Sequence, residues 1–160
     1  MKDWTRSSLQ IFTILLALFA TAFVARMLSF QWSGLPYNID GLSELRLAEL
    51  IQDDGFLDLP AGTSVSDGYV SHMPILALFI AFLSSVTGLD PASSMQLIVS
   101  FIGALVVSVF FIVFRQHLPS SKAVLASALA LALLGSFVFS TGCTWKETLG
   151  FLLLGLALFS

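Results

Sequence analysis

Long apolar runs separated by short polar segments make up most of this 160-residue chain. A helix needs about 20 predominantly apolar residues to cross the hydrocarbon core of a membrane. Residues 9–30, 95–114 and 123–140 form runs of about that length, and Arg26 is the one charged residue within them. We therefore predict that each of these runs is a membrane-spanning helix.

Two further apolar runs are shorter. The 14 residues 73–86 are too few to cross readily, which favours a re-entrant or interfacial helix. The run 148–160 reaches the last residue without a polar cap, and a terminal carboxylate near the bilayer centre is costly. We therefore expect an incomplete span there, and a chain that is the N-terminal part of one larger transmembrane domain.

The polar segment 31–72 contains seven of the ten acidic residues of the chain. Within it, Leu42, Leu45 and Ile51 recur at helical spacing, and Gly55 is suited to ending a helix. The apolar positions are spread broadly around the helix rather than confined to a narrow stripe. This pattern predicts a membrane-edge amphipathic helix that lies on the membrane surface or against the spans.

Composition agrees with a membrane location. The chain is 57% hydrophobic and 11% charged, whereas soluble domains average about 25% charged residues. Such a chain cannot coat a water-facing particle, and it lacks the basic surface that nucleic-acid binding requires. A single cysteine excludes a disulfide within the chain and a cysteine-based metal cluster. We expect an all-α, polytopic helix bundle, and no nucleic-acid partner.

The distribution of positive charge predicts an orientation. Lys2 and Arg6 precede the first span, which places the N-terminus in the cytoplasm and segment 31–72 outside. The basic segment 115–122 is cytoplasmic only if residues 73–86 dip into the membrane and return. Both this charge and the shortness of that run favour a returning segment. We therefore expect a multi-pass protein of the cell membrane.

The first apolar run also has the features of a secretory signal peptide. A basic start and an apolar core are followed by Ala20-Thr21-Ala22, which fits a cleavage site. The apolar run nevertheless continues to Phe30, as it does in a retained membrane anchor. Both interpretations stand, and the retained anchor is favoured.

Asp40 and its neighbours are the first candidates for chemistry. Asp40 either caps the predicted helix or acts as a general base or metal ligand at the membrane face. Glu44 lies one helical turn further on, so both carboxylates can face one side. Arg46 is able to hold a phosphate, although pairing with Glu49 or Glu44 is the simpler role. His72 is either an acid–base group or a residue that caps the next helix.

These residues and the order of the segments resemble a known family. A span followed by the segment 40–51, Asp-Gly-Leu-Ser-Glu-Leu-Arg-Leu-Ala-Glu-Leu-Ile, resembles the first external loop of GT-C fold glycosyltransferases. That family includes oligosaccharyltransferase catalytic subunits, protein O-mannosyltransferases and aminoarabinose transferases. Its members have a catalytic or metal-binding aspartate after the first span, a position that Asp40 matches. His72-Met-Pro74 likewise resembles the His-Pro-Pro that often opens the membrane-dipping segment of the family.

The next external segment departs from the family pattern. Oligosaccharyltransferases carry a second acidic metal motif there, whereas residues 140–148 contain only Glu147, next to Lys146. The departure argues against the metal-dependent branch, so a divalent metal cofactor has no second acidic motif to support it, and we assign no metal ligand. Lys146 and Glu147 either contact a lipid phosphate and an acceptor or form an ion pair at a helix start.

The resemblance implies a membrane glycosyltransferase that takes a sugar from a lipid-phosphate-linked donor at the outer membrane face. It implies Asp40 as the catalytic residue, with Glu44, Arg46, His72, Lys146 and Glu147 binding substrate. Membrane lipids and the remaining transmembrane helices of a longer chain are the implied partners, and this part alone is not expected to be active. The alternative is a non-catalytic integral membrane protein: part of a transporter, a scaffold or a truncated remnant.

Overall fold

A computed structural model describes residues 8–29, 39–55, 75–143 and 145–159, and these residues form helices and short turns without a strand. Helix α1 (Ser8–Ser29) has 22 residues and helix α5 (Pro91–His117) has 27. Both are long and apolar enough to cross a membrane. The described part therefore confirms an all-helical chain with membrane-spanning potential.

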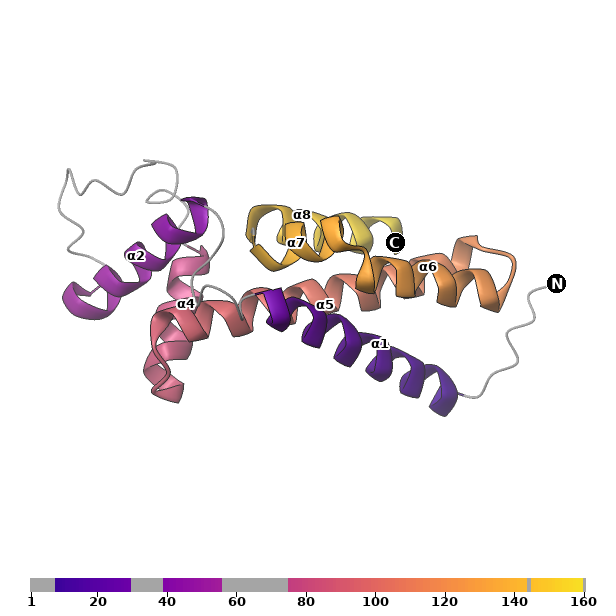
Figure 1. The fold of residues 1–160 in the computed structure, drawn as a ribbon, viewed down its shortest axis with the longest axis horizontal. Helices are drawn as coiled ribbons and strands as arrows, with labels where there is room; N and C mark the ends of the chain where they lie inside the picture. Colours follow the sequence, from indigo (N-terminus) through magenta and orange to yellow (C-terminus); the bar gives the residue numbers. More distant parts are fainter. Residues whose placement is uncertain (1–7, 30–38, 56–74, 144, 160) are drawn as a thin grey trace.

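Helices α1 and α5 lie side by side as an antiparallel pair (Figure 1). Near one end, the side chain of Gln96 donates a hydrogen bond of 3.3 Å to the carbonyl oxygen of Met27. Further along, Leu18 of α1 shares a buried cluster with Phe111 of α5. Because the two helices run in opposite directions, α1 ends where α5 begins, at the same end of the molecule.

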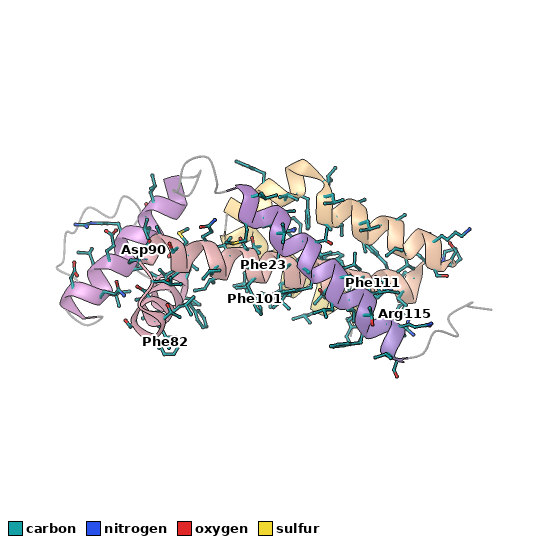
Figure 2. All side chains as sticks on the ribbon, turned by 60° about the horizontal axis from the view of Figure 1, so that its bottom comes forward. Phe23, Phe82, Asp90, Phe101, Phe111 and Arg115 are labelled. Atoms are coloured by element: carbon teal, nitrogen blue, oxygen red, sulfur yellow. The ribbon has the colours of Figure 1, made fainter. Side chains whose placement is uncertain are left out.

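Helices α2 (Ile39–Asp54) and α4 (Ile75–Thr87) lie at that shared end. They pack on each other and on the start of α5, and their buried side chains form one apolar cluster, which includes Leu47, Ile80 and Val99. Helix α4 lies crosswise to α5 in both Figures 1 and 2. The predicted amphipathic helix thus rests against the other helices, and Gly55 ends it with φ of 79°.

A tight turn joins α4 to α5 and sets their relative direction. Gly88 has φ of 73°, a backbone conformation that glycine adopts without strain. Asp90 then caps α5, because its carboxylate accepts a hydrogen bond of 2.9 Å from the backbone N–H of Ser93. Pro91 follows in the first turn of α5, where no backbone donor is needed.

The third predicted span, residues 123–140, is divided in the structure. Helix α6 (Ser121–Leu133) and helix α7 (Gly135–Cys143) meet at an angle of 58°. Leu134 between them is extended, with ψ of 113°, and Gly135 has the low helix propensity that tolerates such a break. The apolar run is therefore a bent pair of helices rather than one continuous helix.

Helix α8 (Trp145–Phe159) follows α7 and packs along α5. A side chain at Gly155 would approach Cγ1 of Val109 to 2.8 Å, so this glycine allows the two helices to lie close together. Small residues have this role in helix pairs within membranes. Helices α1, α6, α7 and α8 thus surround α5, with α2 and α4 at one end (Figure 1).

Candidate functional site

Helix α2 places the predicted acidic residues at the end of the bundle. The helix begins at Ile39, so Asp40 lies in its first turn rather than at the cap position. Carboxylates in this turn are favoured by the positive end of the helix dipole. The backbone of Asp40 is described, whereas its side chain lies outside the described part. Glu44, one turn further on, is buried.

Glu44 and Arg46 are on different sides of α2. Glu44 is 6% exposed and belongs to the side that packs on the other helices. The side chain of Arg46 is 64% exposed and pairs with Glu49, with 3.0 Å between Nη1 and Oε2. Of the two roles predicted for Arg46, the structure contains the ion pair. A surface pair of this kind contributes about 0.2–1 kcal/mol.

The remaining predicted residues are placed only in part. His72 lies outside the described residues. Lys146 and Glu147 are in the first turn of α8, and their side chains are likewise outside the described part. The next residue, Thr148, is buried and donates a hydrogen bond of 3.1 Å to the carbonyl oxygen of Thr141. This bond fixes the start of α8 against the end of α7.

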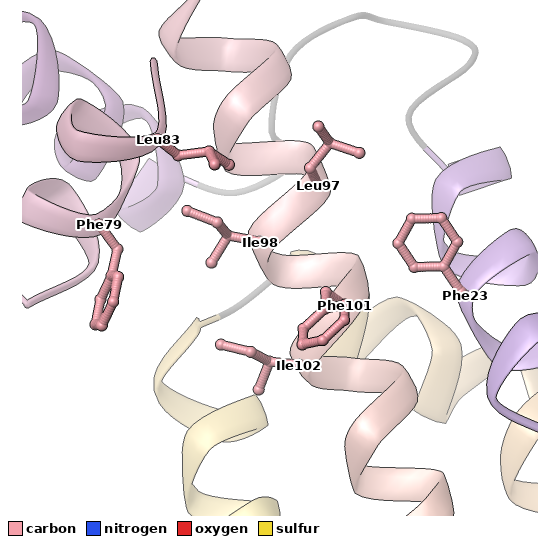
Figure 3. A pocket seen from close by; sticks show the side chains of 7 residues that line it. All are labelled: Phe23, Phe79, Leu83, Leu97, Ile98, Phe101 and Ile102. Carbon is pink, nitrogen blue, oxygen red and sulfur yellow. The ribbon is translucent and has the colours of Figure 1, made fainter. Parts of the chain in front are cut away.

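An apolar groove crosses the side of α5 near the shared end. It has a volume of about 440 Å³, within the range of small-molecule sites. Figure 3 shows that Phe79 and Leu83 of α4 lie on one side and Phe23 of α1 on the other. The floor comes from α5 and comprises Leu97, Ile98, Phe101 and Ile102. With only hydrocarbon side chains around it, the groove suits an apolar chain.

Sequence reasoning missed the role of Arg26, which is completely buried in the described structure. Its Nε donates a hydrogen bond of 2.9 Å to the hydroxyl of Thr141. Its Nη1 donates a bond of the same length to the carbonyl oxygen of Ala22, one turn earlier in α1. The guanidinium also lies 5.8 Å from the centre of the Phe137 ring, within cation–π range. The sequence did indicate a role for Arg26, because ionisable residues within apolar spans generally have a specific function.

Two features of the neighbouring helices accommodate this charge. Arg26 meets the last turn of α7, where the carbonyl groups form the negative end of the helix dipole. On α5, Gly103 leaves the required space, because a Cβ atom there would be 2.5 Å from Nε of Arg26. A cation in the apolar interior is thus compensated by hydrogen bonds, a helix dipole and an aromatic face.

The described residues contain no group of three or more His, Cys, Asp or Glu side chains that could hold a metal ion. Comparison with protein-family models, with curated proteins and with solved structures finds no match. The site is therefore defined by its own geometry: a polar helix, a crosswise apolar helix beneath it, and a hydrocarbon-lined groove.

Proposed function

We propose that this chain forms the donor-binding part of a membrane glycosyltransferase that uses a lipid-phosphate-linked sugar. One observation carries the proposal: α4 connects a polar helix with an apolar groove. Its buried face, which includes Ala77, Ile80 and Ala81, packs with α2, the helix in which Asp40 occupies the first turn. Phe79 and Leu83 of the same helix line the groove.

This arrangement suits a substrate with a long apolar tail and a charged head. The tail would lie in the groove between α1, α4 and α5, and the phosphate and sugar would extend toward α2. The resemblance of residues 40–51 to the first external loop of GT-C glycosyltransferases supports the same assignment. The alternation of long apolar helices with one acidic polar segment is in accord with it.

In the proposed reaction, an acceptor hydroxyl or amide attacks the anomeric carbon of the sugar. The bond from that carbon to the phosphate oxygen breaks, and its electron pair leaves with the polyprenyl phosphate. Asp40 takes the proton of the acceptor as general base. Cationic groups would stabilise the negative charge of the leaving phosphate. His72 and Lys146 are assigned this role, and Arg46 would take part only after leaving Glu49.

Replacement of Asp40 by asparagine tests the proposal. Membranes that contain the full-length protein are incubated with radiolabelled lipid-linked sugars extracted from the cells that make it, and label in the acceptor fraction is counted. Loss of a general base lowers the rate about a hundredfold or more, so we expect transfer to be almost abolished. Asp53→Asn, in the exposed part of the same helix, is the matched control. Full transfer by Asp40→Asn in the full-length protein, or none by the unmodified full-length protein, contradicts the proposal.

One observation favours a second candidate, a part of a transporter. Transporters often combine broken helices with ionisable residues inside the membrane, and here Arg26 lies against α7, the second half of a bent pair. Under this alternative, vesicles that contain the protein accumulate an anion, and the Asp40→Asn substitution leaves this uptake unchanged. Replacement of Arg26 by methionine then abolishes that uptake.

A further inference from the structure

Helix α4 has an outward face composed mainly of hydrocarbon side chains, with Ser85 as an exposed hydroxyl at its edge. Ile75, Leu78, Phe79, Phe82 and Val86 are between 38% and 67% exposed. Their spacing of three or four residues places them on one side of the helix. The other side, which includes Leu76, Ala77 and Ile80, is buried in the cluster shared with α2 and α5. Within the described structure, α4 is therefore mainly apolar on both faces, apart from Ser84 and Ser85, and covered on only one.

The position of α4 argues against a crossing of the membrane. Along the chain it comes between the end of α1 and the start of α5, which are at the same end of the molecule (Figure 1). Its 13 residues correspond to about 20 Å of helix, less than the ~30 Å of a hydrocarbon core. Helix α4 runs crosswise to α5 (Figure 2). If α1 and α5 cross the membrane, α4 therefore lies parallel to the membrane plane.

The outward face of α4 also continues surfaces that a membrane would cover. Phe79 borders the groove together with Phe101 of α5 and Phe23 of α1. In the last two turns of α1, Val24 and Leu28 are 54% and 59% exposed. Helix α2, on the covered side of α4, presents Arg46 and Asp53 to solvent together with the half-exposed Leu42. Polar and apolar surfaces thus lie on opposite sides of the α2–α4 pair.

From this geometry we infer that α4 lies in the plane of the membrane, with its outward face against the acyl chains of one leaflet and α2 above it at the headgroups. Interfacial helices bury their apolar face about 5–10 Å into the headgroup–acyl boundary. This inference rests on the packing of α1, α2, α4 and α5, and it holds whether or not the protein transfers a sugar.

Nitroxide scanning in phosphatidylcholine vesicles tests the inference. Cys143 is the only cysteine, so single cysteines are introduced into a Cys143→Ser chain at Ile75, Phe79, Phe82 and Val86. Each label is measured for collisions with oxygen, which concentrates in the bilayer, and with a water-soluble nickel chelate. We expect oxygen collisions to dominate at all four positions, with a ratio that shows no trend along the helix.

Two control series calibrate the result. A label at Asp53 of α2, which is exposed, should reverse the ratio in favour of nickel. A second series places labels along α1, at the exposed positions Phe12, Leu16, Val24 and Leu28. Because this helix is long enough to cross the membrane, the measured depth should be greatest in the middle of the series and smaller at both ends. A circular dichroism spectrum identical to that of the parent chain is required of every variant.

Three results would overturn the inference. A steady gradient of depth from Ile75 to Val86 would indicate a helix that crosses the membrane, because these positions are about 16 Å apart along the axis. Low collision rates with both reagents would indicate that another helix or a second copy covers the face. Dominant nickel collisions would place the face in water. Phe82→Trp, in a chain whose own tryptophans are replaced by phenylalanine, gives an independent check, since brominated acyl chains should quench its fluorescence.

Discussion

The guanidinium of Arg26 donates a hydrogen bond of 2.9 Å to the hydroxyl of Thr141, 115 residues further along the chain. The Thr141 hydroxyl in turn donates to the carbonyl oxygen of Phe137 at 2.7 Å. Its backbone carbonyl accepts from Thr148. One arginine thereby connects α1 to α7 and, through Thr141, to α8, in an interior that otherwise offers mainly apolar packing.

Replacement of Arg26 by alanine should strongly destabilise the protein. The change removes both hydrogen bonds and leaves a cavity among α1, α5 and α7, and large-to-small changes in a buried site cost about 2–5 kcal/mol. We expect a clear fall in the midpoint of thermal unfolding in detergent micelles, followed by circular dichroism. Arg46→Ala, at an exposed surface pair, should change the midpoint little. An unchanged midpoint for Arg26→Ala would show that the buried hydrogen bonds do not hold α7 in place.

Gly103→Ala should be destabilising for a related reason. The added methyl group would be 2.5 Å from Nε of Arg26 and 2.6 Å from the backbone oxygen of Thr141. The backbone contact cannot be relieved by rotating a side chain, and overpacking of this kind costs about 1–3 kcal/mol. Gly150→Ala in α8 is the matched control, because a Cβ atom there has no neighbour within 4 Å.

The control substitution, Gly150→Ala, should change the stability in the opposite direction. Alanine is favoured over glycine within a helix by about 1 kcal/mol, so Gly150→Ala should be neutral or stabilising in the same unfolding experiment. Equal effects of the two substitutions would contradict the close packing of α1, α5 and α7. In the Arg26→Ala background the Gly103→Ala change should become milder, since its close approaches to Arg26 have been removed and only the one to the Thr141 oxygen is left.

The Asp90 cap predicts a pH dependence confined to the acidic range. Hydrogen bonds from the hydroxyl and the backbone N–H of Ser93 lower the pKa of Asp90 below its ordinary value. A lowered pKa in the folded state means that the carboxylate stabilises the fold above its unfolded pKa of about 3.9. That stability is lost as the pH falls through the folded pKa.

We therefore expect Asp90→Ala to reduce stability at neutral pH by about 1 kcal/mol, and less if the exposed site is screened by salt. The difference from the parent chain should shrink as the pH is lowered below about 4. Unfolding midpoints between neutral and acidic pH provide the measurement, and Asp53→Ala serves as an acidic residue outside the cap. A difference that persists undiminished in acid would mean that the carboxylate charge is not what stabilises the turn.

The positions of the long helices could be predicted from the sequence because membrane helices are defined by local apolar length. The run 95–114 lies within α5, and the run 9–30 corresponds to α1 apart from one residue at each end. The break at Leu134 could not be predicted in the same way. The run 123–140 contains no proline, and Gly135 was the one local sign of a division that depends on packing against α1 and α5.

The candidate site was predictable only as a list of residue types. Helical spacing brings Asp40 and Glu44 to neighbouring turns, and the structure keeps both in α2. The spacing does not state which side of α2 faces the bundle, so the burial of Glu44 and the exposure of Arg46 depend on α4. The partner of Arg26 could not be inferred either, because Thr141 approaches it only through the packing of α7 on α1.

The groove gives a prediction that joins packing to function. Ile98→Trp places a larger side chain in the floor between Phe79 and Phe23, so a hydrocarbon chain should no longer fit. If the groove holds the tail of the donor, photo-crosslinking of the protein to a polyprenyl phosphate with a light-activated tail should fall about tenfold, a free-energy change of about 1.4 kcal/mol.

Leu153→Trp, on an exposed part of α8, is the control for a new tryptophan on an apolar surface. Ile98 also packs against the buried cluster of α2, α4 and α5, so the unfolding midpoint of the variant is measured alongside and must show a folded protein. Crosslinking that survives Ile98→Trp in a normally folded protein would mean that the lipid tail binds elsewhere, and the link between α4 and donor binding would then be lost.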